Sequence, residues 1–360
     1  MKIVIAGGGT GGHLFPGIAI AEAFLSGDRQ NEILFIGTER GIEKRVLPQL
    51  GYPLRLLDVE GIKNRGWLKA FGALLKIPKS IGQSIKILRE FSPRIVIGVG
   101  GYASGPAVLT AWLLGIPTAI AEQNALPGVT NRILGHFVKS VFLSFPDTAH
   151  WFPAGKTVLT GNPVRASFRL AMRERSEKSA QDRFTLLIFG GSQGAHVINM
   201  AMISALEHLT SIKDRLMVIH QTGNNDYEAV AAAYNSHGFA ADVQPFIMDM
   251  QEVYRKADLL VCRSGATSLA EITALGKVSI LIPFARAVHD HQTKNAEVLV
   301  KAGAAEMIAE RDLSGEKLAE RIQSLCRHPE EMARMGDNSI KLGNWNAADD
   351  VVDACIALLH

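Results

Sequence analysis

A glycine-rich turn that occurs twice constrains the fold of this chain more than any other feature. Residues 2–13 read KIVIAGGGTGGH and residues 185–196 read TLLIFGGSQGAH, and the two copies align without a gap. In each copy, an apolar run of strand length passes into glycines and then into a helical pattern. Only glycine lets backbone N–H groups approach phosphate oxygens closely at a helix N-terminus. The repeat predicts two similar nucleotide- or phosphate-binding domains that face one another.

Strand-length apolar runs alternate with helical patterns through both halves, which predicts an α/β fold of doubly wound parallel sheets. The expected strands cover residues 3–6, 32–36, 94–98, 118–121, 185–189, 216–220, 259–261 and 279–282, with a first helix from about Pro16 to Leu25. Ligands of such sheets bind beyond the carboxyl ends of the strands. The candidate site segments are therefore 7–13, 100–105, 122–124, 190–195, 262–268 and 283–292.

A Gly-Asn-Pro turn at 161–163 is expected to close the first domain, residues 1–163, and Arg165 to open the second, residues 164–340. The remaining segment, 341–360, ends in a helix expected at 347–359. Its apolar side chains fall on one face and need a partner surface; they are Ala348, Val351, Val352, Cys355, Leu358 and Leu359.

Composition limits the class of protein. The chain is 47% hydrophobic and 20% charged, without a run of eighteen apolar residues, which is typical of a soluble globular protein. The N-terminus is expected to be a strand and not a signal peptide. Three cysteines without CxxC spacing indicate a reducing compartment, and the cytoplasm is the expected location.

Charge is distributed unevenly. Residues 1–163 carry 17 Lys/Arg against 10 Asp/Glu, and residues 164–360 carry 21 against 25. An excess of seven positive charges in the first half suggests an anionic partner there, such as phosphate groups or a membrane surface. A chance imbalance of solvated lysines is the alternative.

The first turn contains a literal GxGxxG, which raises the alternative of a dinucleotide-dependent dehydrogenase. An NAD site also needs an acidic residue at the end of the second strand, where Gly37 and Thr38 stand instead. The second copy of the turn does not fit GxGxxG. A Walker A motif is missing, and no Asp-x-Asp pair occurs to hold a metal. A diphosphate would then be held by helix N-termini and basic side chains.

Residues 264–271, SGATSLAE, follow a strand and open a helix whose N–H groups and positive dipole end can hold phosphate. One turn in, Glu271 can accept hydrogen bonds from a ribose diol. The alternative is a first-turn carboxylate that only complements the helix dipole.

His13 ends the first glycine turn, where a neutral imidazole can act as a base near pH 7. It can equally be a hydrogen-bonding residue at a helix start, and the same applies to His196. His289-Asp290-His291 is interpreted as a hydrogen-bonded loop and not a metal site, because no third ligand is obvious.

A basic amphipathic stretch lies between Gly61 and Arg94, with eight Lys/Arg against Glu90 alone. It can lie on an anionic bilayer, or it can be a crossover helix packed on the sheet. The residues expected at a membrane are Trp67, Leu68, Phe71, Leu74, Leu75, Ile81, Ile85 and Trp112, with Lys69, Lys76, Lys79 and Lys86 around them.

Seven segments together resemble the MurG family, the UDP-N-acetylglucosamine transferases that convert lipid I to lipid II in bacterial peptidoglycan synthesis. They are GGGTGGH at 7–13, GGYASGP at 100–106, EQN at 122–124, GNPVR at 161–165, GGSQGA at 190–195, CRSGA at 262–266 and HDHQTKNA at 289–296. The resemblance covers the whole chain. It implies a GT-B fold, which consists of two Rossmann-like domains with a cleft between them. The second domain would bind the UDP-sugar, and the first would bind the acceptor and the membrane surface. The last helix would cross back to the first domain.

The resemblance also implies which residues contact the donor. They are Thr10, Gly11, Gly12, Asn124, Arg165, Ser192, Ile247, Ala266, Thr267, Ser268, Leu269, Ala270, Glu271 and Gln292. The segment TSLAE at 267–271 stands where some relatives have LTVSE, and a single Gln follows His291 where some have two. These departures keep Glu271 in place.

The implied reaction is inverting transfer of N-acetylglucosamine to the C4 hydroxyl of the lipid-linked muramyl group, with release of UDP and without metal or cofactor. His13 is the expected general base, and Glu122 is its competitor. The expected partners are UDP-N-acetylglucosamine, lipid I, an anionic membrane surface, and cell-wall synthesis and division proteins, but not nucleic acid. The expected location is the cytoplasmic face of the bacterial inner membrane. A non-hydrolysing UDP-sugar epimerase and a non-catalytic sugar-nucleotide sensor remain as alternatives.

Overall fold

The structure is a computed structural model that describes residues 1–39, 41–59, 67–168, 183–191, 193–285, 287 and 290–359, with the side chains of 67–77 excepted. The chain forms two compact units. The first comprises Met1–Ala166 and Asn344–His360, and the second comprises Ser167–Gly343. Arg165, expected to open the second domain, therefore belongs to the first unit. Each unit is described by itself.

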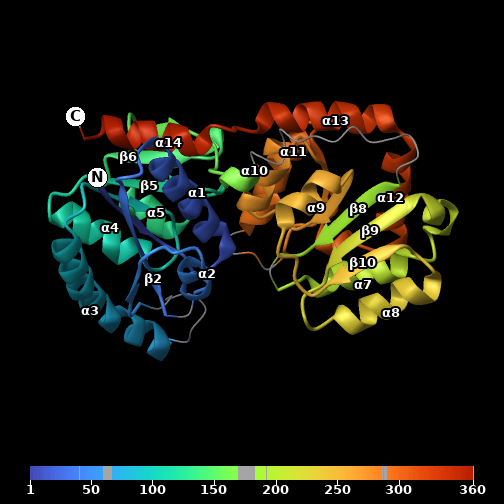
Figure 1. Ribbon diagram of the computed structural model, residues 1–360, viewed down its shortest axis with the longest axis horizontal. Helices are drawn as coiled ribbons and strands as arrows, with labels where there is room; N and C mark the ends of the chain where they lie inside the picture. Colours follow the sequence, from blue (N-terminus) through green and yellow to red (C-terminus); the bar gives the residue numbers. More distant parts are fainter. Residues whose placement is uncertain are drawn as a thin grey trace. The chain divides into compact units, whose positions relative to one another are not determined.

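The first unit is built on seven parallel strands within its described residues, in the order β3-β2-β1-β4-β5-β6-β7. Strands β2, β5 and β6 of this sheet are labelled in Figure 1. Its strands are β1 (Lys2–Ala6), β2 (Glu32–Thr38), β3 (Leu54–Leu57), β4 (Ile95–Gly98), β5 (Thr118–Glu122), β6 (Ser140–Leu143) and β7 (Thr157–Leu159). Its helices are α1 (Gly11–Gly27), α2 (Glu43–Gln49), α3 (Trp67–Phe91), α4 (Ser104–Leu113), α5 (Val129–Leu134), the 3-10 helix η1 (Pro146–Trp151) and α14 (Ala347–Ala357).

The second unit has six parallel strands among the residues described, in the order β10-β9-β8-β11-β12-β13. Its strands are β8 (Phe184–Phe189), β9 (Leu216–Gln221), β10 (Ala241–Gln244), β11 (Leu259–Cys262), β12 (Val278–Leu281) and β13 (Ala305–Met307). Its helices are α7 (His196–Ala205), η2 (Thr210–Arg215), α8 (Tyr227–His237), α9 (Met250–Lys256), α10 (Ala266–Ala274), α11 (His291–Lys301), η4 (Glu310–Asp312), α12 (Gly315–Arg327) and α13 (Pro329–Leu342).

The two sheets share one topology. In each unit, the second and third strands lie on one side of the first strand, and the fourth strand lies on its other side. The predicted doubly wound parallel sheets are confirmed. The order reverses between β1 and β4 in the first unit and between β8 and β11 in the second. Loops separate at such a switch point and leave a crevice at the carboxyl ends of the strands. Both glycine turns lie at these points.

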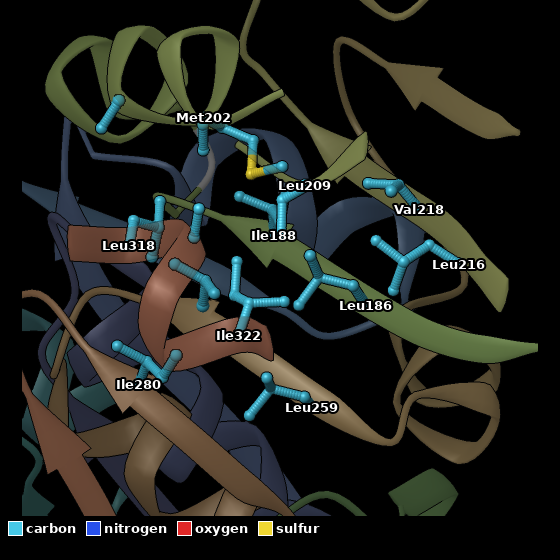
Figure 2. Packing of buried hydrophobic residues seen from close by; sticks show 14 of the residues in the cluster. Leu186, Ile188, Met202, Leu209, Leu216, Val218, Leu259, Ile280, Leu318 and Ile322 are labelled. Atoms are coloured by element: carbon cyan, nitrogen blue, oxygen red, sulfur yellow. The ribbon is translucent and has the colours of Figure 1, made fainter. Parts of the chain in front are cut away.

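The central strands β4, β5, β11 and β12 are buried along their whole length because helices cover both faces of the sheets, whereas the edge strands β3 and β10 are partly exposed. In the second unit, Leu186 and Ile188 of β8 face Leu259 of β11 and Ile280 of β12, while Met202 of α7 closes the layer from above (Figure 2). The core continues on α12, where Leu318 and Ile322 are fully buried. This packing fixes the strand ends that carry the loops of the unit.

The first helix begins at Gly11, five residues before the expected start at Pro16. The proline is the sixth residue of the helix and therefore lies after its first turn. As a result, the first turn of α1 is made of Gly11, Gly12 and His13. The last helix packs against α1 in the first unit, with Ala348, Val351, Val352 and Cys355 buried. It ends at Ala357 rather than Leu359.

Candidate active site

The first glycine turn is fastened to the ends of neighbouring strands. Gly7 donates its N–H to the Ile36 carbonyl at 2.9 Å, and Gly8 donates to the Gly100 carbonyl at 3.3 Å. Gly9 donates to Oε2 of Glu43 at 2.7 Å. These three N–H groups therefore face the protein and not a ligand. An anion at this turn would have to bind at the start of α1, where the N–H groups of Gly11 and its neighbours point along the helix axis.

His13 lies in the first turn of α1, at the switch between β1 and β4. Its ring rests on the backbone of Gly100, where an added Cβ would come within 2.6 Å of the imidazole Nδ1. Gly100 also has a φ of +90°, so this position favours glycine on two grounds. Nδ1 is buried. Gly100, the first residue of the GGYASG segment, thus forms the backbone surface against which the His13 ring packs.

Glu122, at the end of β5, is 2% exposed and organises the loop that follows it. Its Oε1 accepts hydrogen bonds from the backbone and side chain of Asn124, at 3.0 and 3.3 Å. Its Oε2 accepts from the Gly128 N–H at 3.0 Å and from the Asn131 side chain at 2.9 Å. Both oxygens are engaged within the protein, a burial that the position of Glu122 in the sequence does not reveal. Asn131 is a site residue that the sequence analysis missed.

Two expected donor ligands of the first unit are placed at the same edge. Asn124 is held by Glu122, as described above. The guanidinium of Arg165 stacks over the ring of Phe15 in α1, 4.5 Å from its centroid. A stacked guanidinium keeps its N–H groups at the edge of the plane, where they can reach an anion. Arg165 thus lies against α1, which also carries His13, whereas Asn124 lies in the loop after β5.

The glycine turn of the second unit lies against the loop after β9. An added Cβ on Gly194, whose φ is +73°, would collide with the carbonyl group of Thr222. Gln221, at the end of β9, is 4% exposed and bridges two loops. It donates to the Gly191 carbonyl at 2.8 Å and accepts from the Ile247 N–H at 2.9 Å. The expected ligand Ile247 is thus held in place by a residue the sequence analysis missed, while Ser192 lies outside the described residues.

Helix α10 carries the expected phosphate and ribose ligands, Ala266 to Glu271. Gly265 precedes it in an extended conformation, so the helix N-terminus opens directly after the loop. Glu271 is 6% exposed. Burial raises the pKa of the Cys262 thiol at the end of β11, and the charge of Glu271 raises it further. Ser264 ties this loop to α11 by donating to the Gln292 carbonyl at 2.8 Å.

Gln292, the expected sugar ligand, is only partly available. Its side-chain oxygen accepts a hydrogen bond from the Phe284 N–H at 3.0 Å. The NH2 group is the half of this amide that can donate to a ligand. Arg263 fixes the same loop by donating to the carbonyls of Ile282 and Pro283, both at 3.1 Å, and to Glu310 at 2.6 Å.

A buried polar network connects the core of the second unit to its site edge. His220 lies 3.1 Å from Oδ1 of Asn199 and 3.0 Å from the hydroxyl of Tyr234. Asn199 donates to Thr222 and to Asp226, so its oxygen must accept from the Nε2–H of His220. Burial lowers the pKa of His220 to about 3. The imidazole is therefore neutral, and its Nδ1 accepts from Tyr234.

Near the start of α7, His196 pairs with Asp226 at 2.9 Å, consistent with a hydrogen-bonding role. His289 lies outside the described residues. Among the residues that are described, no group of three His, Cys, Asp or Glu side chains is placed to hold a metal ion. The three cysteines are all buried and free.

The expected membrane residues fall on α3 and α4 of the first unit. The side chains of Trp67, Leu68, Lys69, Phe71, Leu74, Leu75 and Lys76 lie outside the described residues. Trp112 is 42% exposed and its ring packs on Phe137, with centroids 4.8 Å apart. Ile81 and Ile85 are half-buried. Lys79 pairs with Asp58 at 2.7 Å, and Lys86 lies 3.9 Å from Glu90.

A hollow of about 450 Å³ adjoins this surface on α5. Ile133 is 56% exposed there, and the Arg132 guanidinium lies over the Trp151 ring, 4.4 Å from its centroid. The hollow is lined by Val129, Arg132, Ile133, His136, Phe137 and Trp151. We name these six residues, together with Trp112, the α5 patch. No helix within the described residues is long and apolar enough to cross a bilayer.

Comparison with known proteins identifies the class. Residues 3–143 match the glycosyltransferase family 28 N-terminal domain, and residues 185–351 match the corresponding C-terminal domain. A crystal structure of MurG from Acinetobacter baumannii superposes with a TM-score of 0.80 at 32% identity, over 99% of both chains. The two Rossmann-like units thus define a glycosyltransferase of the GT-B fold.

A curated relative from Syntrophus aciditrophicus is 58% identical over 360 residues, which is 100% of this chain and 99% of the relative. It is named UDP-N-acetylglucosamine--N-acetylmuramyl-(pentapeptide) pyrophosphoryl-undecaprenol N-acetylglucosamine transferase. The chain belongs to this family of transferases, within glycosyltransferase family 28. A UDP-GlcNAc 2-epimerase from Neisseria meningitidis superposes with a TM-score of 0.70, over 99% of this chain and 100% of the epimerase, but at 17% identity, so it shows the shared fold alone.

Proposed function

We propose that this chain transfers N-acetylglucosamine from UDP-N-acetylglucosamine to the C4 hydroxyl of the muramyl sugar of lipid I. The products are lipid II and UDP, and the anomeric carbon is inverted. The observation that carries the proposal is the identity of 58% along the full length of a relative named for this transfer. Both glycine turns lie within the aligned region, which covers 100% of this chain.

The second unit is proposed to hold the donor. The N-terminus of α10, from Ala266 to Ser268, would take the diphosphate, because the positive end of the helix dipole attracts phosphate groups. Glu271 would accept hydrogen bonds from the ribose diol. Ile247 would contact the base through its backbone carbonyl, because its N–H is bonded to Gln221. Leu269 and Ala270 complete the turn that presents Glu271, and Ser192 and the NH2 group of Gln292 would reach the phosphate and the sugar.

The first unit is proposed to hold the acceptor, with its diphosphate near the start of α1 at Thr10, Gly11 and Gly12. This assignment replaces the donor contact that the resemblance implies for these three residues, because they lie in the first unit. The acceptor oxygen O4 attacks the anomeric carbon C1 while the bond between C1 and the β-phosphate oxygen breaks. The electron pair leaves with UDP, and the O4 proton passes to His13. Because Nδ1 of His13 is buried against Gly100, Nε2 would be the atom that takes the proton.

Glu122, the alternative candidate for the general base, is proposed to have a structural role instead. Four N–H groups already converge on its carboxylate from Asn124, Gly128 and Asn131. Both oxygens of such a carboxylate already accept hydrogen bonds from the loop, so neither is directed at the acceptor hydroxyl. Glu122 would therefore present Asn124 to the substrate, and His13 remains the proposed base.

Membrane docking is proposed through the first unit, because a polyprenyl-linked acceptor cannot leave the bilayer. The α5 patch supports this placement, since it exposes Ile133 and Trp112 beside the cation Arg132. Anionic lipid attracts such a surface, and its aromatic rings suit the headgroup region. The protein would act on the cytoplasmic face of the bacterial inner membrane, beside proteins of cell-wall synthesis and division, and would serve cell shape through its product.

Incubation with UDP-N-acetylglucosamine and a soluble lipid I analogue tests the proposal. The expected products are a disaccharide acceptor and one UDP for each sugar transferred. Conversion of the donor to UDP-N-acetylmannosamine without acceptor would instead indicate an epimerase, and binding without turnover would indicate a sensor. Replacement Glu271→Ala should reduce transfer by about a hundredfold at limiting donor, through loss of charge-assisted hydrogen bonds.

A further inference from the structure

A buried carboxylate lies beneath the first glycine turn. Glu43, the first residue of α2, is 0% exposed. Its Oε2 accepts the Gly9 N–H at 2.7 Å, and its Oε1 accepts both the N–H and the hydroxyl of Thr38, at 2.8 and 3.0 Å. Three donors converge on two oxygens, which suits a group that only accepts hydrogen bonds.

The chain makes room for this carboxylate with glycines. An added Cβ on Gly8 would come within 2.5 Å of Cδ of Glu43, and one on Gly37 would come within 2.5 Å of its Cγ. A Cβ on Gly41 would collide with both carboxylate oxygens. Segments from the ends of β1 and β2 and from the start of α2 therefore close around one side chain.

This arrangement bears on the site because Gly9 lies two residues before the start of α1 at Gly11. Gly7 and Gly8 are tied to the ends of β2 and β4 through backbone bonds, and Glu43 supplies the third tie. The direction in which the turn enters α1 depends on all three. That direction sets where the first N–H groups of the helix point and where His13 meets Gly100.

We propose that Glu43 is a positioning residue, which holds the glycine turn so that the start of α1 can bind a diphosphate and His13 can reach the acceptor hydroxyl. The role of His13 and the diphosphate rests on the proposed function. The tie between Glu43 and the turn does not. A misplacement of about 1 Å in such a site can lower the rate about a hundredfold.

The decisive variant is Glu43→Gln, which keeps size and burial. Whichever way its amide is turned, an NH2 group meets the N–H of Gly9 or the donors of Thr38, so one tie is lost. Gly41→Ala is a second variant, since its φ lies outside the left-handed region and its methyl group acts only by displacing Glu43. Glu39→Gln is the control, because Glu39 is exposed and pairs with Lys44.

Three measurements are made on folded full-length protein: hydrogen exchange of the peptide spanning residues 7–15, binding of UDP, and steady-state transfer to a lipid I analogue. Glu43→Gln and Gly41→Ala are expected to speed amide exchange in this peptide and to lower kcat about a hundredfold, with UDP binding unchanged. The double variant should lose no more than either single one. Glu39→Gln should match the wild type.

Unchanged exchange and unchanged kcat in a folded Glu43→Gln protein would overturn the proposal. If that variant does not fold, Thr38→Val decides, because it removes only the hydroxyl donor and should give a smaller change of the same sign; no change in exchange would overturn it. If the wild type transfers no sugar, the proposed function fails, while the exchange data still decide whether Glu43 holds the turn.

Discussion

The side chain of Gln221 accepts a hydrogen bond from the Ile247 N–H at 2.9 Å and donates another to the Gly191 carbonyl at 2.8 Å. One amide, placed at the end of β9, thereby sets the spacing between the second glycine turn and the loop that is proposed to contact the base of the donor. Neither residue is near Gln221 in sequence, so the connection exists only in the fold.

Replacement Gln221→Leu should therefore weaken the binding of UDP. Leucine has a similar size but leaves the Ile247 N–H and the Gly191 carbonyl without partners, at about 1–3 kcal/mol each. We expect the dissociation constant for UDP, measured by calorimetry, to rise about tenfold or more. Gln323→Leu is the matched control, since Gln323 makes only exposed bonds on α12. Equal UDP affinity in the Gln221→Leu protein would show that the bridge does not shape the donor site.

Replacement His13→Ala should lower kcat by about 10²–10⁴-fold, the usual contribution of a general base. UDP binding should stay as in the wild type, because the donor is assigned to the other unit. His208→Ala, an exposed histidine of the second unit, serves as control. A different outcome, a raised KM for the acceptor at a nearly normal kcat, would make His13 a diphosphate ligand instead.

Fold class was readable from the sequence because its signals are local. An apolar run followed by glycines marks β1 and β8 without reference to any distant residue, and the helical pattern after each run is equally direct. The loops at the strand ends were also correctly located. The predicted start of α1 at Pro16 is wrong, because the helix begins at Gly11 and a proline can lie inside a helix.

The parts of the site that the sequence did not reveal depend on contacts between distant segments. Glu43 stands 34 residues from the Gly9 N–H that it accepts, and Gln221 stands 26 residues from Ile247. Both resemble ordinary polar residues of a helix and a strand. Glu122 was noticed, but its burial and its bond to Asn131 come from the turn of the chain after β5. Burial of this kind cannot be judged from residue type alone.

Membrane binding should require anionic lipid and weaken with salt, because each exposed cation near a charged surface contributes about 1 kcal/mol. Arg132→Gln in the α5 patch should reduce sedimentation with anionic vesicles. Lys79→Gln should do so less, because Lys79 is already paired with Asp58. Ile133→Ser in the same patch should also reduce sedimentation. Its control is Leu50→Ser, which removes an equally exposed apolar side chain just after α2, outside the α5 patch. Equal sedimentation with neutral and anionic vesicles would contradict the docking surface.

Stability should fall between pH 7 and pH 5 because of His220. Its folded pKa of about 3 lies below the unfolded value near 6.5, so the unfolded chain takes up a proton first as the pH falls. The contribution is complete above about pH 6.5 and is lost toward pH 3, with a loss of about 2 kcal/mol at pH 5. Asp226 stays charged in this range. Burial opposes its ionisation, yet hydrogen bonds with His196 and Asn199 hold its pKa below the usual value.

Urea unfolding at pH 5 and pH 7 checks this expectation, with His220→Gln as the comparison. Glutamine does not titrate, so the difference in unfolding free energy between the two pH values should shrink in the variant. The same difference in both proteins would assign the pH dependence to other groups, and His220 would then have no special part in it.

The most direct measurement is NMR of the glycosidic linkage that the protein forms. The donor is UDP-N-acetylglucosamine labelled with carbon-13 at C1 of the sugar, and the acceptor is a lipid I analogue. The donor carries an α-linked sugar, and inverting transfer to the C4 hydroxyl predicts a β-linked anomeric carbon coupled to C4 of the muramyl ring, with an equal amount of UDP. An α-linked product would contradict inversion. A label that stays on UDP, as unchanged donor or as N-acetylmannosamine, would contradict the transfer itself.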